Sequence, residues 1–343
     1  MHKRLYVLLL LPLLGGCANT GFYWQSATGQ MEIWKKEQPI QKVLADPQTP
    51  PQLKDKLKVV LRMREFASRE LALPDNGSFR KYADLGRPYV LWNVFAAPEF
   101  SIKPKEWCFI FTGCVSYRGY FSESEAGWFA EGQQIQGYDV FVAGVPAYST
   151  LGWFDDPVLN TFIDDPETEV AGLIFHELAH QVVYVKDDTT FNESFAVTVQ
   201  EEGVARWLAK YGTPEQREAH VIALQRKKDF AQLVMKYRNM FDELYRSDIS
   251  EAKKREGKRQ IFSKLQQEYT QLKIAWGGFS GYDHWLPPEA NNASLASIAT
   301  YTELVPSFQA LLAKNGGDLA RFYQAVKEIA GQPKSERDAR LAH

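Results

Sequence analysis

The pentapeptide His176-Glu177-Leu178-Ala179-His180 constrains this chain more than any other feature. Residues four apart share one face of a helix, so the two imidazoles can bind a single zinc ion. The glutamate beside the first histidine can then take a proton from an attacking water, which is typical of zinc-dependent peptide hydrolysis. The alternative is a pair of buried histidines with a purely structural role.

The flanking residues predict the helix that the two imidazoles need. Asp165 is a suitable N-cap and Pro166 a suitable first helical residue. The histidines fall on a different face from the apolar residues, as expected for a helix that lines a cleft. The apolar side chains recur at helical spacing, at Val170, Leu173, Ile174, Leu178 and Val182.

A catalytic zinc site needs three protein ligands and one open position. The sequence predicts a second helix with Asn192 as its N-cap, ending at about Leu208. Glu193 would then lie in the first turn of this helix. A loop between the two helices can bring that carboxylate back against the histidines.

The run Phe191–Ala196 resembles the thermolysin and aminopeptidase N type of zinc peptidase, the gluzincins. In those families a glutamate on the next helix completes the metal site, so the resemblance implies Glu193 as the third zinc ligand. The spacing from His180 is shorter than in those families. Glu201 and Glu202 lie at a more usual distance and remain alternatives.

The same resemblance implies two further groups. A tyrosine or histidine after the motif stabilises the oxyanion in gluzincins; Tyr301 is the first candidate, and Tyr282 and His284 are alternatives. Thermolysin-like enzymes also carry an acid one turn after the third ligand, which orients a histidine. Val197 occupies that position here, so the orienting group is not identified.

The N-terminus predicts export and a lipid anchor. Two basic residues precede the apolar run Leu5–Leu14, which is too short to remain as a membrane-spanning helix. The residues Leu14-Gly15-Gly16-Cys17 resemble a bacterial lipobox, which implies a signal peptide over residues 1–16 and lipidation of Cys17. Ala18 favours the outer membrane, by resemblance to sorted lipoproteins. The alternative is an ordinary signal peptide with an incidental cysteine.

Two further cysteines, Cys108 and Cys114, lie close together in the sequence. In an oxidising compartment we expect a disulfide between them. Two buried free thiols are the alternative.

The composition is that of a globular protein, with 45% hydrophobic residues and a formal charge of −2. This balance gives no reason to expect nucleic-acid binding. We expect an α+β fold that is mostly helical. It would comprise a tether over residues 17–28, a zincin-like part over 29–211 with a small mixed sheet and the metal-site helices, and a helical part over 212–343 that closes the cleft. A long helical hairpin should begin the last part, and Tyr138–Val145 should form the edge strand above the zinc.

Taken together, these segments resemble the putative aminopeptidase family of proteobacterial lipoproteins, from Cys17 to about Ala330. The resemblance implies fold and envelope location more than substrate. It rests on Leu91–Val94, Tyr117–Phe121, Ala147–Phe154, His176–Gln181, Phe191–Ala196 and Asn291–Ala293.

We therefore expect a zinc peptidase, more specifically an aminopeptidase, with a peptide substrate and a membrane contact through the lipid on Cys17. The Gly-x-Met-Glu-Asn strand that anchors the substrate amine in aminopeptidase N is absent from the sequence. Glu123, Glu125, Asp155 or Asp156 could replace it. The alternatives are an endopeptidase acting on envelope proteins or cell-wall peptides, and a non-catalytic zinc-binding lipoprotein.

Overall fold

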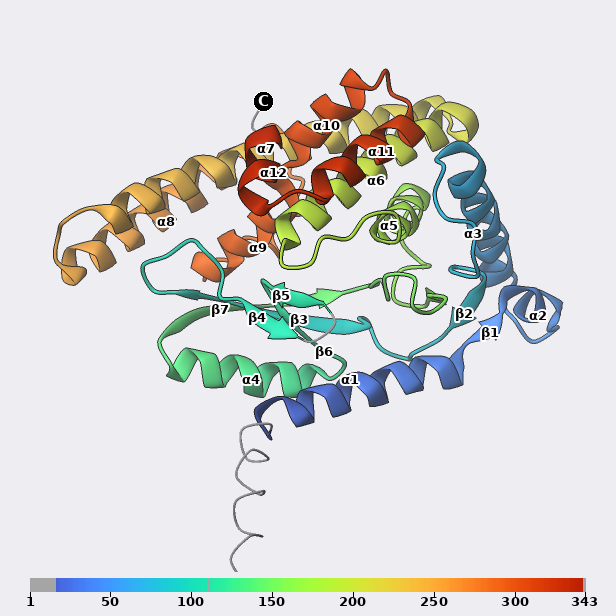
Figure 1. Cartoon of the computed structure of the whole chain (residues 1–343), viewed down its shortest axis with the longest axis horizontal. Helices are drawn as coiled ribbons and strands as arrows, with labels where there is room; N and C mark the ends of the chain where they lie inside the picture. Colours follow the sequence, from blue (N-terminus) through green and yellow to red (C-terminus); the bar gives the residue numbers. More distant parts are fainter. Residues whose placement is uncertain (1–16, 110–111, 342–343) are drawn as a thin grey trace, which may run out of the picture.

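The computed structural model describes residues 17–109 and 112–341, which form a mostly helical fold with three small sheets (Figure 1). This confirms the expected α+β class, with the strands before the HExxH helix. The zincin-like arrangement stays a prediction. The strands are β1 (Gln38–Pro39), β2 (Lys81–Ala83), β3 (Leu91–Pro98), β4 (Trp107–Phe109), β5 (Gly113–Val115), β6 (Arg118–Tyr120), β7 (Tyr138–Val145) and β8 (Val158–Leu159). The helices are α1 (Cys17–Lys36), α2 (Ile40–Ala45), α3 (Pro51–Glu70), α4 (Glu123–Ile135), α5 (Glu167–His180), α6 (Thr189–Tyr211), α7 (Pro214–Arg246), α8 (Glu251–Ala275), α9 (Asn292–Thr302), α10 (Val305–Lys314), α11 (Leu319–Ala330) and α12 (Lys334–Leu341).

The antiparallel sheet β6-β3-β7 forms a layer between two helices. Successive side chains of a strand point to opposite faces. Trp92 and Val94 of β3 therefore pack with residues of α4, whereas Phe95 and Ala97 pack with Ala293 of α9. Helix α4 thus covers one face of the sheet, and α9 the other (Figure 1).

The hairpin β4–β5 supports the loop between α5 and α6. A disulfide joins Cys108 and Cys114 across this hairpin. The backbone N–H of Cys114 donates to Oδ1 of Asp187 at 2.6 Å. The hydroxyl of Tyr184 donates to the carbonyl of Thr112 at 3.1 Å. The remaining strands form the mixed sheet β1-β2-β8.

Helices α7 and α8 form the expected long hairpin, which has its own apolar core around Phe230, Phe241 and Leu265. The later helices belong instead to the main core. Phe322 of α11 is buried in the same cluster as Leu57 of α3. The main core therefore includes residues from both sides of the expected boundary at residue 212, because α10 to α12 return to pack on the first half of the chain.

The expected tether over residues 17–28 is wrong, because these residues form the first part of α1. Packing explains the difference. Phe22 stacks on Phe109 at 4.8 Å between ring centroids, and Oε1 of Gln25 accepts from the backbone N–H of Phe121 at 3.0 Å. Across residues 17–109 and 112–341, no helix has both the length and the apolar character needed to span a bilayer.

Candidate metal centre

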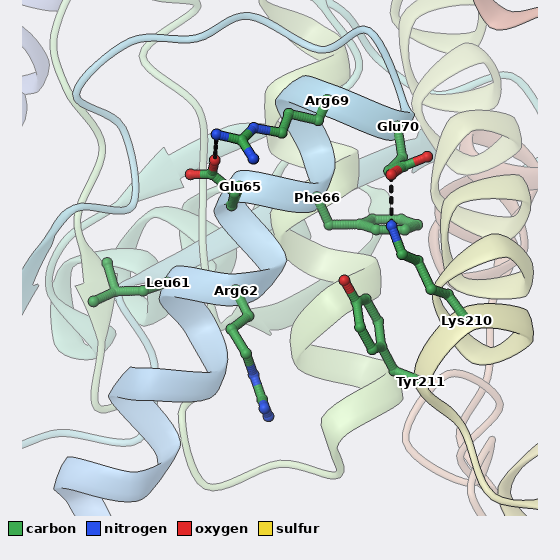
Figure 2. A pocket seen from close by; sticks show the side chains of 8 residues that line it. All are labelled: Leu61, Arg62, Glu65, Phe66, Arg69, Glu70, Lys210 and Tyr211. Carbon is green, nitrogen blue, oxygen red and sulfur yellow. Dashed lines mark hydrogen bonds and ion pairs between the residues drawn. The ribbon is translucent and has the colours of Figure 1, made fainter.

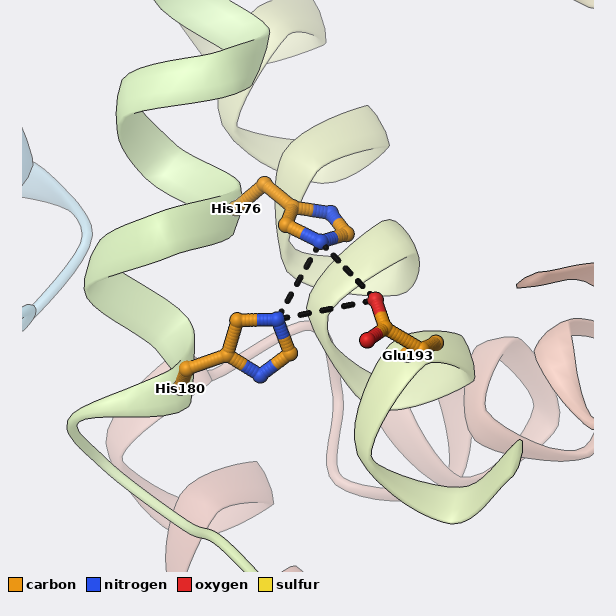
Figure 3. A group of neighbouring side chains, drawn as sticks. All are labelled: His176, His180 and Glu193. Carbon is orange, nitrogen blue, oxygen red and sulfur yellow. Dashed lines mark hydrogen bonds and ion pairs between the residues drawn. The ribbon is translucent and has the colours of Figure 1, made fainter. Parts of the chain in front are cut away.

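Helix α5 carries both histidines of the pentapeptide. It begins at Glu167 with Pro166 as its N-cap, one residue later than expected. Ile174 and Leu178 are fully buried in the main core, as their spacing predicts. The histidines lie on another face, which turns toward α6 (Figure 3).

Helix α6 begins earlier than expected, at Thr189, with the side chain of Asp188 capping the N–H of Phe191. Asn192 is therefore not the N-cap. Its side-chain amide instead accepts from the N–H of Val185 and donates to the carbonyl of Val185, both at 2.7 Å. This buried pair of hydrogen bonds closes the loop between the helices.

The side chains of His176, His180 and Glu193 converge between α5 and α6 (Figure 3). Nε2 of His176 lies 3.2 Å from Oε2 of Glu193 and 3.2 Å from Nε2 of His180. Nε2 of His180 lies 3.6 Å from the same Oε2. The side chains are 8–12% exposed, so the three donor atoms form a small buried triangle that can hold one metal ion.

The two buried carboxyl groups of this centre have pKa values shifted in opposite directions. Burial alone would raise the pKa of Glu193, but the two histidines outweigh it and hold the pKa at about 2. Burial raises the pKa of Glu177 to about 8, and the nearby carboxylates of Glu193 and Asp156 add to this effect. Two carboxyl groups beside two imidazoles suit a divalent cation, whose charge would stabilise both carboxylates.

A group that sequence reasoning missed orients one of the candidate ligands. Oε1 of Gln200 lies 3.1 Å from Nδ1 of His176. An amide oxygen can only accept, so His176 carries its proton on Nδ1 and turns the lone pair of Nε2 toward the triangle. Gln200 lies seven residues after Glu193, so both residues lie on the same face of α6, two helical turns apart. That spacing could have identified Gln200 from the sequence.

Tyr301 of α9 lies close enough to the centre for the charges of Glu193 and Glu177 to affect its pKa. It is strongly desolvated, and burial followed by the charge of Glu193 raises its pKa well above the usual value. The pKa of Tyr117 is also raised well above its usual value, by burial and then by the charge of Glu193. Sequence reasoning did not single out this residue for the site. Of the two alternatives to Tyr301, Tyr282 stacks on Phe230 at 4.4 Å between ring centroids, in the core of the α7–α8 hairpin. His284 packs on Trp285, whose other ring neighbours include Tyr301.

The alternative third ligands also point elsewhere. Glu201 pairs with Lys227 at 2.7 Å and accepts from Gln309. Glu202 pairs with Arg206 at 2.7 Å. The structure therefore brings Glu193 to the histidines, and leaves these two acids in ion pairs on other faces of α6.

Asp156 is one of the four candidate amine anchors, and it lies near Glu177. It is 4% exposed, and it contributes to the raised pKa of Glu177. Its two carboxylate oxygens accept from the backbone N–H of Thr150, at 3.1 and 3.2 Å. Asp156 therefore holds the loop 146–157 in place, with its carboxylate already engaged.

Strand β7 presents an open edge, as expected of the segment Tyr138–Val145. It pairs with β3 on one side, and within the described residues no strand pairs with its other side. The carbonyl of Val140 turns away from β3 and accepts from Asn291. By the alternation of an antiparallel strand, the backbone groups of Val142 and Gly144 face the same open edge.

A surface pocket of about 360 Å³ lies between α3 and the end of α6 (Figure 2). Two of its cations are neutralised by pocket acids, since Arg69 pairs with Glu65 and Lys210 with Glu70. None of its lining residues belongs to the metal centre.

The geometry thus defines a buried centre of two histidines and a glutamate on an HExxH helix pair. A family model described as "Putative aminopeptidase" matches residues 21–341. This match spans nearly the whole chain, so the protein belongs to the putative aminopeptidase family, as the sequence resemblance predicted. No curated protein and no solved structure matches the chain.

Proposed function

We propose that this protein is a zinc-dependent peptidase of the bacterial envelope, and more specifically an aminopeptidase. The observation that carries the proposal is the buried triangle of His176, His180 and Glu193, with Glu177 beside it. Membership of the putative aminopeptidase family supports the peptidase class independently.

The size of the triangle supports zinc as the metal. Zinc bonds of 2.0–2.1 Å in a tetrahedron place the ligand atoms about 3.3 Å apart. The three donor atoms are 3.2, 3.2 and 3.6 Å apart. Two histidines and one glutamate are also the protein ligands of hydrolytic zinc sites such as that of thermolysin. When bound, zinc would supply Lewis-acid activation of water and of the scissile carbonyl.

The chain's own residues supply the remaining chemistry. Glu177 accepts a proton from the attacking water and passes it to the leaving amine. The hydroxyl of Tyr301, whose raised pKa keeps it protonated even in alkaline solution, donates a hydrogen bond to the oxyanion. Gln200 keeps His176 in the tautomer that leaves Nε2 free to bind the metal.

The open edge of β7 supports an extended peptide as substrate. The outward backbone groups of Val142 and Gly144 can hydrogen-bond a peptide that adds as a further strand, whereas the carbonyl of Val140 already accepts from Asn291. Helix α9 carries Tyr301 and begins beside this edge, where Asn291 contacts Val140. A peptide bound there would therefore pass the element that carries the oxyanion donor.

Hydrolysis of paired peptides tests the proposed activity. The zinc-loaded protein is incubated with peptides of one sequence, with either a free or an acetylated N-terminus, and a chelator-treated sample serves as the control. We expect zinc-dependent release of the first residue from the free peptides alone. Cleavage of the acetylated peptides would make the protein an endopeptidase, and absence of cleavage across a broad panel would contradict the peptidase proposal.

The envelope location is also proposed, because it rests on the segment up to Cys17, most of which lies outside the described residues. We expect the mature protein to begin at Cys17 and to carry lipid there. Mass spectrometry of the N-terminal peptide, together with separation of inner and outer membranes, checks both points. An unmodified N-terminus, or protein in the soluble fraction, would contradict the anchor.

A further inference from the structure

The outward side of α1 carries an apolar stripe. Trp24 is 70% exposed, and Met31 and Trp34 are each 40% exposed. These residues are seven and three positions apart, so they lie along one face of the helix, with exposed Ala27 between them. Large apolar side chains in a row on a solvent-facing helix indicate a surface that another phase or partner covers.

Helix α4 carries a second pair of exposed apolar side chains. Trp128 is 70% exposed and Ile135 is 81% exposed, and their spacing of seven residues places them on one face. The neighbouring residues Phe22 and Phe129 pack in one cluster, which brings α1 and α4 to the same side of the sheet (Figure 1). We call Trp24, Met31, Trp34, Trp128 and Ile135 the α1–α4 face.

The charge pattern of α1 fits a lipid surface. Its first fifteen residues, Cys17–Met31, contain no Asp, Glu, Lys or Arg. The charges come at its end, where Glu32 pairs with Lys36 and Arg87. Tryptophan is the side chain most typical of the bilayer interface, because its ring is apolar and its N–H is polar.

The position of α1 in the chain favours lipid as the partner of this apolar face. The helix begins at Cys17, the residue that the N-terminal motif marks for lipidation. At a rise of 1.5 Å per residue, Trp24 lies about 10 Å and Trp34 about 25 Å along the helix from that residue. A lipid chain on Cys17 would enter the bilayer where the apolar stripe begins.

We propose that the α1–α4 face is a membrane-docking surface that lies in the headgroup region of the leaflet holding the anchor. This inference rests on the proposed envelope location. It adds that the folded domain lies against the bilayer, with α4 on the membrane side of the sheet and α9 on the opposite side. The metal centre, whose helix α6 packs on α9, would then face away from the lipid.

Fluorescence quenching by lipid tests this orientation in the full-length, naturally processed protein. The protein is reconstituted into phosphatidylethanolamine and phosphatidylglycerol vesicles, with a phospholipid brominated near its headgroup as the quencher. We expect quenching of the wild-type protein and a strong decrease in the triple variant Trp24→Phe, Trp34→Phe and Trp128→Phe, in which Trp153 remains as an exposed fluorophore. These changes keep the face apolar, so folding is preserved. The matched control Trp276→Phe with Trp285→Phe removes fluorophores from the C-terminal half and should leave the quenching intact.

Mass spectrometry of Cys17 on the same preparation separates this proposal from that of the anchor. Quenching without acylation would support the docking surface while contradicting the anchor. An acylated protein without quenching would overturn the docking surface and keep the anchor. Cross-linked dimers that require Trp24, without quenching, would show that a second copy covers this face and would overturn the membrane assignment.

Discussion

Gln200 and His176 face each other across the interface of α5 and α6, with 3.1 Å between Oε1 of the amide and Nδ1 of the imidazole. The contact fixes the tautomer of a proposed metal ligand from a neighbouring helix. An amide is a weaker acceptor than a carboxylate, so His176 is oriented without added negative charge. This links the packing of the two helices to the chemistry of the centre.

Removal of that amide should weaken metal binding without unfolding the protein. We expect Gln200→Ala to lower zinc affinity about 10–100-fold, the range found when the group behind a ligand histidine is lost. Gln200→Glu restores an acceptor and should bind zinc at least as tightly as the wild type. Competition with a chromophoric chelator measures both. Equal affinities in all three proteins would contradict the role given to Gln200.

The third ligand can be tested by a matched pair of substitutions on α6. We expect Glu193→Ala to abolish stoichiometric zinc binding, because only two protein ligands would remain. Glu201→Ala removes an acid from another face of the same helix and should retain zinc. Metal analysis after dialysis decides the matter. Loss of zinc in the second variant alone would assign the ligand to Glu201.

The start of α6 depends on a buried ion pair that sequence reasoning did not include. Asp188 caps the helix and binds Arg337 of α12 at 2.7 Å, with both side chains under 10% exposed. We expect Asp188→Ala to lower the free energy of unfolding by about 3–5 kcal/mol, because it leaves a buried guanidinium unpaired. Lys334→Ala removes an exposed partner of the same carboxylate and should cost about 1 kcal/mol or less. Urea denaturation measures both, and equal losses would contradict the account.

Asp156 should make stability depend on pH. Burial raises its pKa from 3.8 to about 6 in the folded protein. The folded state therefore favours the protonated carboxyl, and this contribution is lost as the pH rises from about 4 to 6. Relative to Asp156→Asn, which does not titrate, the wild type should lose on the order of 3 kcal/mol between pH 4 and 7, at about 1.4 kcal/mol per pKa unit. A difference in free energy of unfolding between the two proteins that stays constant from pH 4 to pH 7 would contradict the shift.

The sequence predicted the elements whose signals are local. Helix α5 has strong helical periodicity, and its start was predicted to within one residue because Pro166 limits where a helix can begin. The hairpin α7–α8 was recognisable from its apolar stripes, and β7 from its apolar run between turn residues. These features require no knowledge of distant contacts.

What the sequence did not predict depends on contacts between distant segments. Helix α1 was expected as a tether, because its packing comes from Phe109 and Phe121, far along the chain. Asn192 looked like an N-cap, but the loop before α6 uses its amide to bind Val185. Tyr117 comes near Glu193 only when the segment before β6 folds against the metal centre.

The most direct test of the central claim compares zinc content and peptide hydrolysis in the wild type, in Glu177→Gln and in Glu202→Gln. Glu177 is not a metal ligand in this account, so its variant should keep one zinc per chain and lose several orders of magnitude in kcat. Glu202 pairs with Arg206 elsewhere on α6, so its variant should keep both zinc and activity. Zinc-loaded Glu177→Gln that hydrolyses peptides at the wild-type rate would contradict the proposed mechanism.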